Sequence, residues 1–128
     1  LAENEEAATA FLAASFKGWI FCRDNSQTCV DYVLESGSTL GAGHQAWMMN
    51  EVNKLIWPSP AGIGIVDEAL WAQSVEILTN YGIIKEAPTE GAYRVDLAQA
   101  AVDSISADVD VVGEDWEAIE VAITANGE

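Results

Sequence analysis

Over most of this 128-residue chain, apolar positions recur with the spacing of α-helices. In the segment 4–25 they fall three and four residues apart, which places them on one face of a helix. Similar patterns cover residues 26–35, 43–57, 66–82 and, more weakly, 96–106. We therefore predict a mainly α fold of about five helices, with residues 1–106 as one helical unit.

The ends of these segments carry residues that start or stop helices. Asn4 and Asp67 stand where an N-cap is expected, and Gly82 stands at a C-cap position. Pro58 ends the third segment, because proline disfavours helical backbone in the residue before it.

The apolar spacing also predicts which side chains of each helix face inward. In chain order these are Ala8, Leu12, Phe16 and Trp19; Cys29, Val30, Val33 and Leu34; Met48, Val52, Leu55 and Ile56; Leu70, Ser74, Ile77, Leu78 and Tyr81; and Leu97, Ala101 and Ile105.

The acidic tail, residues 107–128, shows a different pattern. Val109 and Val111 alternate with aspartates, and a second alternating run covers residues 119–123. A period of two is typical of β-strands, and residues 113–117 fit a hairpin loop. Because a lone two-stranded ribbon is marginal in water, we expect these strands to pair with a partner or else to be mobile.

The charge balance excludes some functions. The chain has 21 acidic and 5 basic residues, a net charge of −16. A nucleic-acid partner is not expected, because phosphate contacts need clustered lysine and arginine. Half of the residues are hydrophobic, enough for a modest core. No run approaches the roughly 20 apolar residues that span a membrane.

Motifs for chemistry are weak. The segment 108–113 resembles the opening of a calcium loop, but Val112 stands at the fifth position and Ile119 at the twelfth, where a bidentate glutamate is required. His44 is the single histidine, and no nucleophile motif accompanies it. We therefore expect no catalytic residue, no metal site and no cofactor, and hence a protein that is not an enzyme.

Three aromatic residues are candidates for contact with a ligand: Trp47, Trp57 and His44. Trp47 lies off the predicted apolar stripe of its helix, so it could cover a partner surface, line a cleft or pack against another lobe. Trp57 ends its helix at a proline turn, where its side chain could either fill a hinge or cover the core. His44 lies in the first turn of the same helix, three residues before Trp47.

Several landmarks together resemble one family. The stretch ATAFLAASFKGW (8–19) is followed by the turn DNSQ (24–27) and by CVDYVL (29–34). Further on come GIVD (64–67) with Trp71, ILTNYGII (77–84) and AYRVDL (92–97). In this order they resemble the C-terminal part of ABC-transporter substrate-binding proteins of the group that takes up nitrate, sulfonates, taurine and pyrimidine precursors of thiamine.

The resemblance implies the helical C-terminal portion of a two-lobed α/β periplasmic-binding-protein fold. Such a protein binds a small organic or anionic solute outside the cell, in the periplasm or anchored at the surface, and presents it to an ABC permease. The main cleft residues would then precede Leu1, so no ligand residue can be assigned here. A fragment of this kind exposes apolar surface, and we expect it to self-associate. The alternatives are an independent helical interaction module and a fragment of an enzyme of thiamine-precursor synthesis.

Cys22 and Cys29 are seven positions apart, across the predicted turn between the first two helices. This spacing fits neither a redox motif with two intervening residues nor a metal site, because further ligands are missing nearby. A disulfide and two buried thiols remain, and a secretory setting favours the disulfide. The pair departs from the usual pattern of the resembling family.

Overall fold

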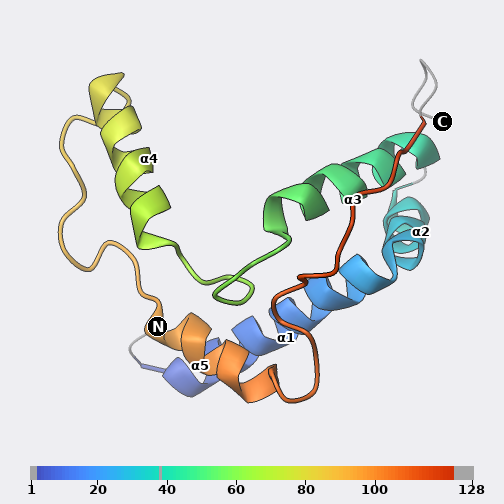
Figure 1. Cartoon of the computed structure of the whole chain (residues 1–128), viewed down its shortest axis with the longest axis horizontal. Coiled ribbons are helices and arrows are strands. Elements are labelled where there is room, and N and C mark those ends of the chain that lie inside the picture. The colour runs from blue at the N-terminus through green and yellow to red at the C-terminus, as the bar shows by residue number, and fades with distance from the viewer. Residues whose placement is uncertain (1–2, 38, 123–128) are drawn as a thin grey trace.

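The computed structural model describes residues 3–37 and 39–122. It contains α1 (Glu5–Asp24), α2 (Ser26–Ser36), α3 (Ala42–Ile56), α4 (Glu68–Asn80) and α5 (Asp96–Ile105). The prediction of a mainly α fold of about five helices is confirmed. In Figure 1, α1 and α5 lie side by side at the base of an open arch, α2 and α3 form one arm, and α4 stands apart as the other.

The predicted helix caps are present. The Asn4 side chain accepts a hydrogen bond from the Ala7 amide at 3.2 Å, and Asp67 accepts one from the Leu70 amide at 2.9 Å. Each cap satisfies an amide that has no partner inside its helix. Gly82 follows α4 with a φ of 66°, a backbone conformation that glycine adopts without strain.

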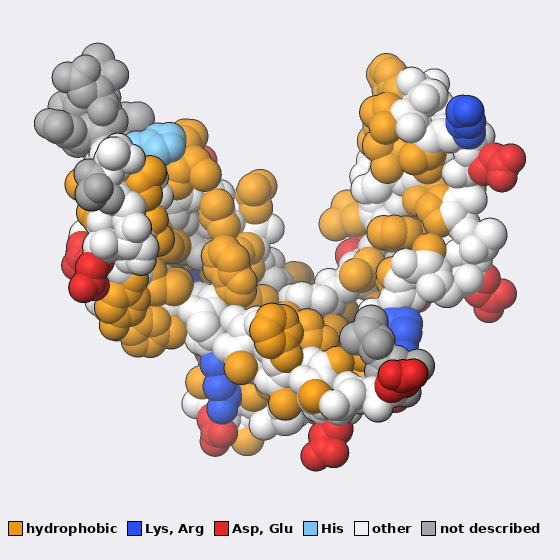
Figure 2. Space-filling model, turned by 180° about the vertical axis from the view of Figure 1, so that it is seen from behind, with side chains coloured by type: hydrophobic (Ala, Val, Ile, Leu, Met, Phe, Trp, Pro, Cys, Tyr) orange, Lys and Arg blue, Asp and Glu red, His pale blue; other side chains and the backbone are white. Residues whose placement is uncertain are grey.

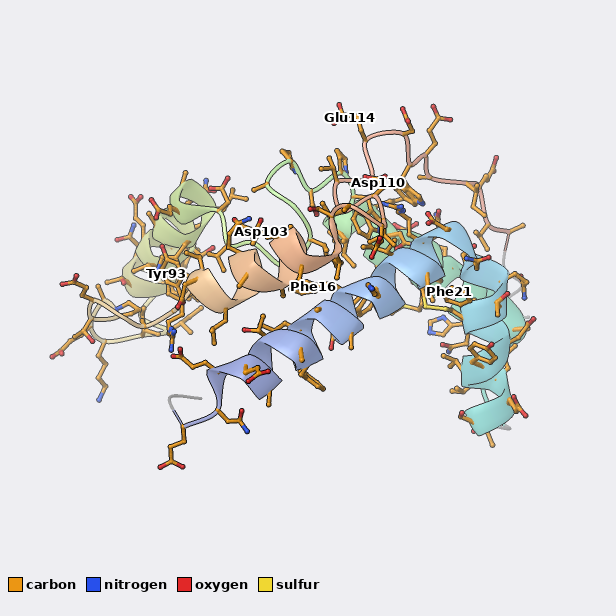
Figure 3. The ribbon with its side chains drawn as sticks, turned by 90° about the horizontal axis from the view of Figure 1, so that it is seen from below. Phe16, Phe21, Tyr93, Asp103, Asp110 and Glu114 are labelled. Carbon is orange, nitrogen blue, oxygen red and sulfur yellow. A yellow bond between two sulfur atoms is a disulfide. The ribbon has the colours of Figure 1, made fainter. Side chains whose placement is uncertain are left out.

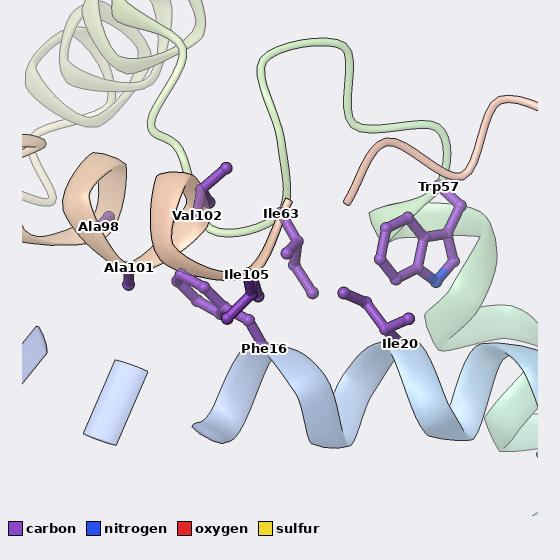
Figure 4. Close-up of a cluster of buried hydrophobic side chains, with 8 residues drawn as sticks. All are labelled: Phe16, Ile20, Trp57, Ile63, Ala98, Ala101, Val102 and Ile105. Atoms are coloured by element: carbon purple, nitrogen blue, oxygen red, sulfur yellow. The ribbon is translucent and has the colours of Figure 1, made fainter. Parts of the chain in front are cut away.

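The core lies between α1, α5 and the loop after α3. Phe16 and Ile20 of α1 meet Ala101 and Val102 of α5, and Ala101 is fully buried. The small side chains of α5 let the larger residues of α1 approach closely, as Figure 4 shows. The cluster comprises Phe16, Ile20, Trp57, Ile63, Ala98, Ala101, Val102 and Ile105.

The burial of α3 differs from the prediction. Met48 is 38% exposed and Leu55 is 88% exposed, whereas Asn50 and Asn53 are buried. The two asparagines face inward because their side chains make specific hydrogen bonds there, Asn53 with Trp57 and Asn50 with the tail. The apolar stripe of α3 therefore does not mark its buried face.

The outer helical faces differ from the prediction as well. No residue of α4 is buried, and its expected inner residues Leu70, Ile77 and Tyr81 are 62%, 48% and 80% exposed. Trp19 of α1 is 43% exposed. These stripes have the spacing of a buried helical face, but no neighbouring element of the described chain covers them.

The prediction of a strand-like tail is wrong for the residues the structure describes. Residues 107–122 contain no strand, and Ile123 lies outside the described residues. The tail instead crosses the molecule: the Ser59 and Ile63 amides donate to the carbonyls of Val112 and Val111 at 2.8 and 3.0 Å. Val109 and Val111 pack against the core, so their alternation with aspartates separates buried from exposed positions without a β-ladder.

The Cys22 and Cys29 side chains meet across the turn between α1 and α2 and form a disulfide, with the two Cα atoms 5.5 Å apart. This arrangement agrees with the bridge favoured from the sequence. It ties the end of α1 to the first turn of α2.

Candidate binding surfaces

The structure brings two of the three aromatic candidates together. The His44 and Trp47 rings stack at the start of α3, with centroids 6.0 Å apart and planes 28° apart, and both side chains are exposed. Trp57 lies at the opposite end of α3 and is 4% exposed. Trp57 is thus a cap on the core, while contact of His44 and Trp47 with a ligand stays a prediction.

Arg23 joins the end of α1 to the tail. Its side chain is 5% exposed, and its Nη1 donates to the Asp110 carbonyl at 2.9 Å and lies 3.2 Å from the Asp110 carboxylate. Its Nε donates to Asp24 at 2.7 Å, and the guanidinium lies 4.6 Å from the centre of the Trp57 ring. A buried guanidinium is tolerated because it is both paired and hydrogen-bonded.

The role of Arg23 could have been predicted from its spacing. It follows Phe16 by seven residues and Ile20 by three, so all three lie on one helical face and the apolar stripe ends in a charged residue. The charge balance by itself gives Arg23 no role, because it is one of five basic residues scattered along the chain. Asn50, Asn53 and Trp116, which lie close to it, have no comparable signal in the sequence.

Asp110 forms a tight turn in the tail. Its carboxylate accepts hydrogen bonds from the Val112 and Gly113 amides, each at 3.0 Å. The Gly113 amide is the main cause of a lowered pKa of the Asp110 carboxyl, and Arg23 lowers it further. Figure 3 shows Asp110 close to the helices and Glu114 pointing away from them. The carboxylate at the third position of the calcium-like segment is thus engaged by backbone amides and by Arg23.

A cavity of about 280 Å³ lies where α1, α2, α3 and the tail meet, and we call it the junction cavity. Among the described residues, three polar or charged side chains are buried, Arg23, Asn50 and Asn53, and all three line this cavity. Asn50 holds the tail over it: its Nδ2 donates to the Ile119 carbonyl at 2.9 Å and its Oδ1 accepts from the Ile119 amide at 3.0 Å.

Two wider grooves are mainly apolar. The α1/α5 groove, of about 780 Å³, is lined by Phe11, Leu12 and Leu97 among others. The α3/α4 groove, of about 450 Å³, lies between Leu55 at the end of α3 and Leu70 on α4. Figure 2 shows hydrophobic side chains on both walls of the hollow between the two arms, with acidic side chains toward the outer edges.

Most of the few basic side chains are already paired within the molecule. Arg94 binds Glu5 at 2.8 Å and also pairs with Asp96, whose carboxyl pKa is lowered mainly by its hydrogen bond from Arg94. Arg23 is bound to Asp24 and Asp110, and Lys54 to Glu51. Lys17 and Lys85 are exposed and form no ion pair among the described residues, so the surface that remains for a partner is mainly apolar and acidic.

Comparison with known proteins gives no relative: no family model, no curated protein and no solved structure matches this chain. Within residues 3–37 and 39–122, no cluster of histidine, cysteine and acidic side chains could hold a metal ion. In the same residues, no helix combines the length and the apolar character needed to cross a membrane.

Proposed function

We propose that this chain is a non-enzymatic binding component that works with its apolar outer faces covered by other protein. The observation that carries the proposal is its accessible surface of 8935 Å². A compact monomer of 13.7 kDa exposes about 6,600 Å². The excess is well above the roughly 800 Å² that one partner contributes to a standard protein–protein interface.

The position of this excess supports docking rather than a loose fold. Leu55, Leu70, Ile77 and Tyr81 are each between 48% and 88% exposed on regular helices or at their ends. A helical stripe of this kind usually faces a core or a partner. The two arms carry their apolar side chains toward the hollow between them, where a covering element would contact both (Figure 2).

The specific form that we propose follows the family resemblance: the C-terminal part of the solute-binding component of an ABC importer, in the periplasm or anchored outside the cell. The covering protein would be the remainder of the two-lobed α/β fold. The whole protein would bind a small organic or anionic nutrient and present it to a membrane permease. The order of the five helices and the uncovered apolar faces support this form.

An independent interaction module is the second candidate, and one observation favours it. The described chain has its own core, from Phe16 to Ile105, and its tail is fixed to that core by Arg23 and Asn50. A segment that folds this far without a sheet can work with a separate partner. In that case the same apolar faces bind a different protein.

The shared part of the proposal is tested with the chain alone. We expect it to bind the neutral dye Nile red and to sediment as a dimer or larger species. The double substitution Leu70→Ser and Ile77→Ser should lower both properties while leaving the helical circular dichroism unchanged, because both side chains are exposed. Glu76→Gln, on the same helix, is the matched control and should change neither. A monomer that binds no dye would overturn the proposal.

The importer form and the module form of the proposal predict different results for dye binding. If the chain is expressed with any coding sequence that precedes Leu1 in its gene, the importer form expects dye binding to disappear. It also expects nitrate or taurine to raise the melting temperature of the longer protein, and not of the 128-residue chain. The module form expects dye binding to persist and neither solute to have an effect.

A further inference from the structure

We infer that the junction cavity binds a small free α-amino acid, with the carboxylate of the ligand toward Asn53 and the first turn of α2 and its ammonium group toward Glu117. This site is separate from the apolar grooves, and the inference does not rest on how those grooves are covered. Pockets for drug-sized ligands span about 300–1,000 Å³, so a cavity of about 280 Å³ suits a smaller molecule.

The side chain of Asn53 provides the first donor. Its Oδ1 accepts from the indole Nε1 of Trp57 at 3.1 Å. Because an indole nitrogen can only donate, this bond fixes the amide orientation and turns Nδ2 away from Trp57. Asn53 is 1% exposed, and its Nδ2 has no acceptor among the described residues.

This donor opens on the cavity. In the described part of the chain, no polar side-chain atom is sealed inside the protein without a hydrogen-bond partner. The Nδ2 of Asn53 is therefore in contact with accessible space, and the cavity is the space that Asn53 lines. A buried amide donor without a protein acceptor is costly unless a water or a ligand supplies the acceptor.

The first turn of α2 provides further donors. Ser26 and Gln27 begin this helix and line the cavity. The usual capping side chain does not satisfy their amides, because Asn25 instead donates its Nδ2 to the Phe21 carbonyl at 3.0 Å. Free amides at a helix N-terminus, together with the positive end of the helix dipole, stabilise a carboxylate.

The charges around the cavity argue against a ligand that carries only a negative charge. Arg23 lines it, but its charge is already matched by Asp24 and Asp110. Glu117 also lines it and forms no ion pair among the described residues. A bound carboxylate therefore needs a cationic group beside it to face Glu117. An amino acid carries both charges and is neutral overall, which also suits a chain with a net charge of −16.

The remaining walls are apolar and leave room for a short side chain. Val30 and Ala46 form one side, and Trp116 of the tail forms another. Asn50 holds the tail in place through both of its hydrogen bonds with Ile119, so the wall carrying Trp116 is fixed. Small or medium side chains, such as those of alanine, serine and glutamine, match this space.

The test titrates the full chain with L-alanine, L-serine and L-glutamine in a calorimeter, and with acetate and methylamine as half-ligands. We expect at least one amino acid to bind with a Kd of about 1 mM or below, and each half-ligand to bind at least about tenfold more weakly. Proton–nitrogen spectra should show shifts of the Asn53 side-chain amide and of the Ser26 and Gln27 backbone amides. Absence of amino-acid binding, or equally tight binding of acetate, would overturn the inference.

Two variants locate the site. Ala46→Leu fills the cavity from α3 with a good helix former and should abolish binding. Glu117→Gln removes the charge that faces the ammonium group and should weaken binding at least about tenfold. Glu120→Gln, which makes the same change on an exposed tail residue outside the cavity, is the matched control and should bind as the parent does. Binding that survives Ala46→Leu would place the ligand elsewhere and refute the site.

Discussion

The guanidinium of Arg23 donates to the backbone carbonyl of Asp110, which lies 87 residues further along the chain. The same group pairs with the Asp110 carboxylate and covers the Trp57 ring. One buried side chain thus connects the end of α1, the end of α3 and the start of the tail. The tail is held by this charge rather than by a β-ladder.

Replacing Arg23 with methionine should lower the free energy of unfolding by about 2–3 kcal/mol, because it removes charge-assisted hydrogen bonds to the tail and leaves the Asp110 carbonyl without its donor. Urea unfolding followed by circular dichroism measures the change. Arg94→Met is the control: it also breaks two ion pairs, but its side chain is 41% exposed, so its effect should be clearly smaller. Equal losses of unfolding free energy in the two variants would show that buried Arg23 stabilises the fold no more than exposed Arg94 does.

The turn at Asp110 predicts a loss of stability in acid. The Gly113 amide and Arg23 lower the pKa of the Asp110 carboxyl below its ordinary value of 3.8 in the folded chain. Its contribution is therefore complete above about pH 3.8 and disappears as the pH falls through the lowered value. Because this side chain is 56% exposed, we expect no more than about 1 kcal/mol.

Asp110→Asn should flatten the pH dependence of stability in that window. Urea midpoints measured from about pH 5 down to about pH 2 would show a smaller decline than in the parent chain. Glu114→Gln, on the same tail and exposed, is the charge-matched control (Figure 3). If the parent and Asp110→Asn lose stability in parallel, the hydrogen bonds at Asp110 do not stabilise the ionised carboxyl.

The local structure of the chain, that is the helix ends and the turn closed by the disulfide, could be predicted from the sequence. Asn4, Asp67 and Gly82 act within one turn of the helix ends that they define, so the sequence alone contains the information. The same holds for Cys22 and Cys29, which a single tight turn brings together. The helix bounds differ from the prediction by two residues at most, and the largest differences are at the two ends of α4.

The buried faces of the helices could be predicted less well than the helix ends. Burial depends on which distant segments pack against each helix. On α3 the pattern favoured Met48 and Leu55, but Asn50 and Asn53 face inward because Ile119 and Trp57 provide their partners. The candidate site was missed for the same reason. The junction cavity joins residues as far apart in the sequence as Arg23 and Ile119, 96 positions, and no local pattern marks them.

Two glycines should respond differently to the same substitution. Gly64 and Gly82 both have positive φ, 78° and 66°, which strains any other residue. A Cβ on Gly64 would also overlap the Phe16 ring, whereas a Cβ on Gly82 would meet open space. Gly82→Ala should therefore lower the free energy of unfolding by about 1 kcal/mol, and Gly64→Ala by roughly 2–4 kcal/mol.

Thermal or urea unfolding of these two variants separates strain from overlap. Phe16→Leu in the Gly64→Ala background should recover part of the loss, because the smaller side chain makes room for the new methyl group. If Gly64→Ala and Gly82→Ala cost the same, Phe16 does not pack against this loop as the structure places it.

The bridge between Cys22 and Cys29 should be visible by mass. The chain purified without reductant should weigh less than the reduced chain by two hydrogen atoms, and alkylation before reduction should modify neither cysteine. Because the closed loop is short, reduction should cost about 2–3 kcal/mol of stability in the chain-entropy model. Complete alkylation of both thiols without reductant would show that the cysteines are free.

Asn50 should control the order of the tail. Its side chain bonds both the amide and the carbonyl of Ile119, in the way that a neighbouring strand would. Asn50→Ala removes both bonds and should speed hydrogen exchange at the Ile119 amide at least about tenfold. Exchange in α5 should stay unchanged, because that helix packs mainly on α1.

Asn50→Asp distinguishes the two bonds from a general loosening. An aspartate keeps the acceptor for the Ile119 amide and loses the donor to its carbonyl, so exchange at this amide should fall between the parent and Asn50→Ala. Leu55→Ala, on the same helix and at a side chain that is 88% exposed, is the control and should leave the tail protected. If the tail exchanges equally fast in all of these chains, Asn50 does not hold it, and the wall that Trp116 gives the junction cavity is not fixed.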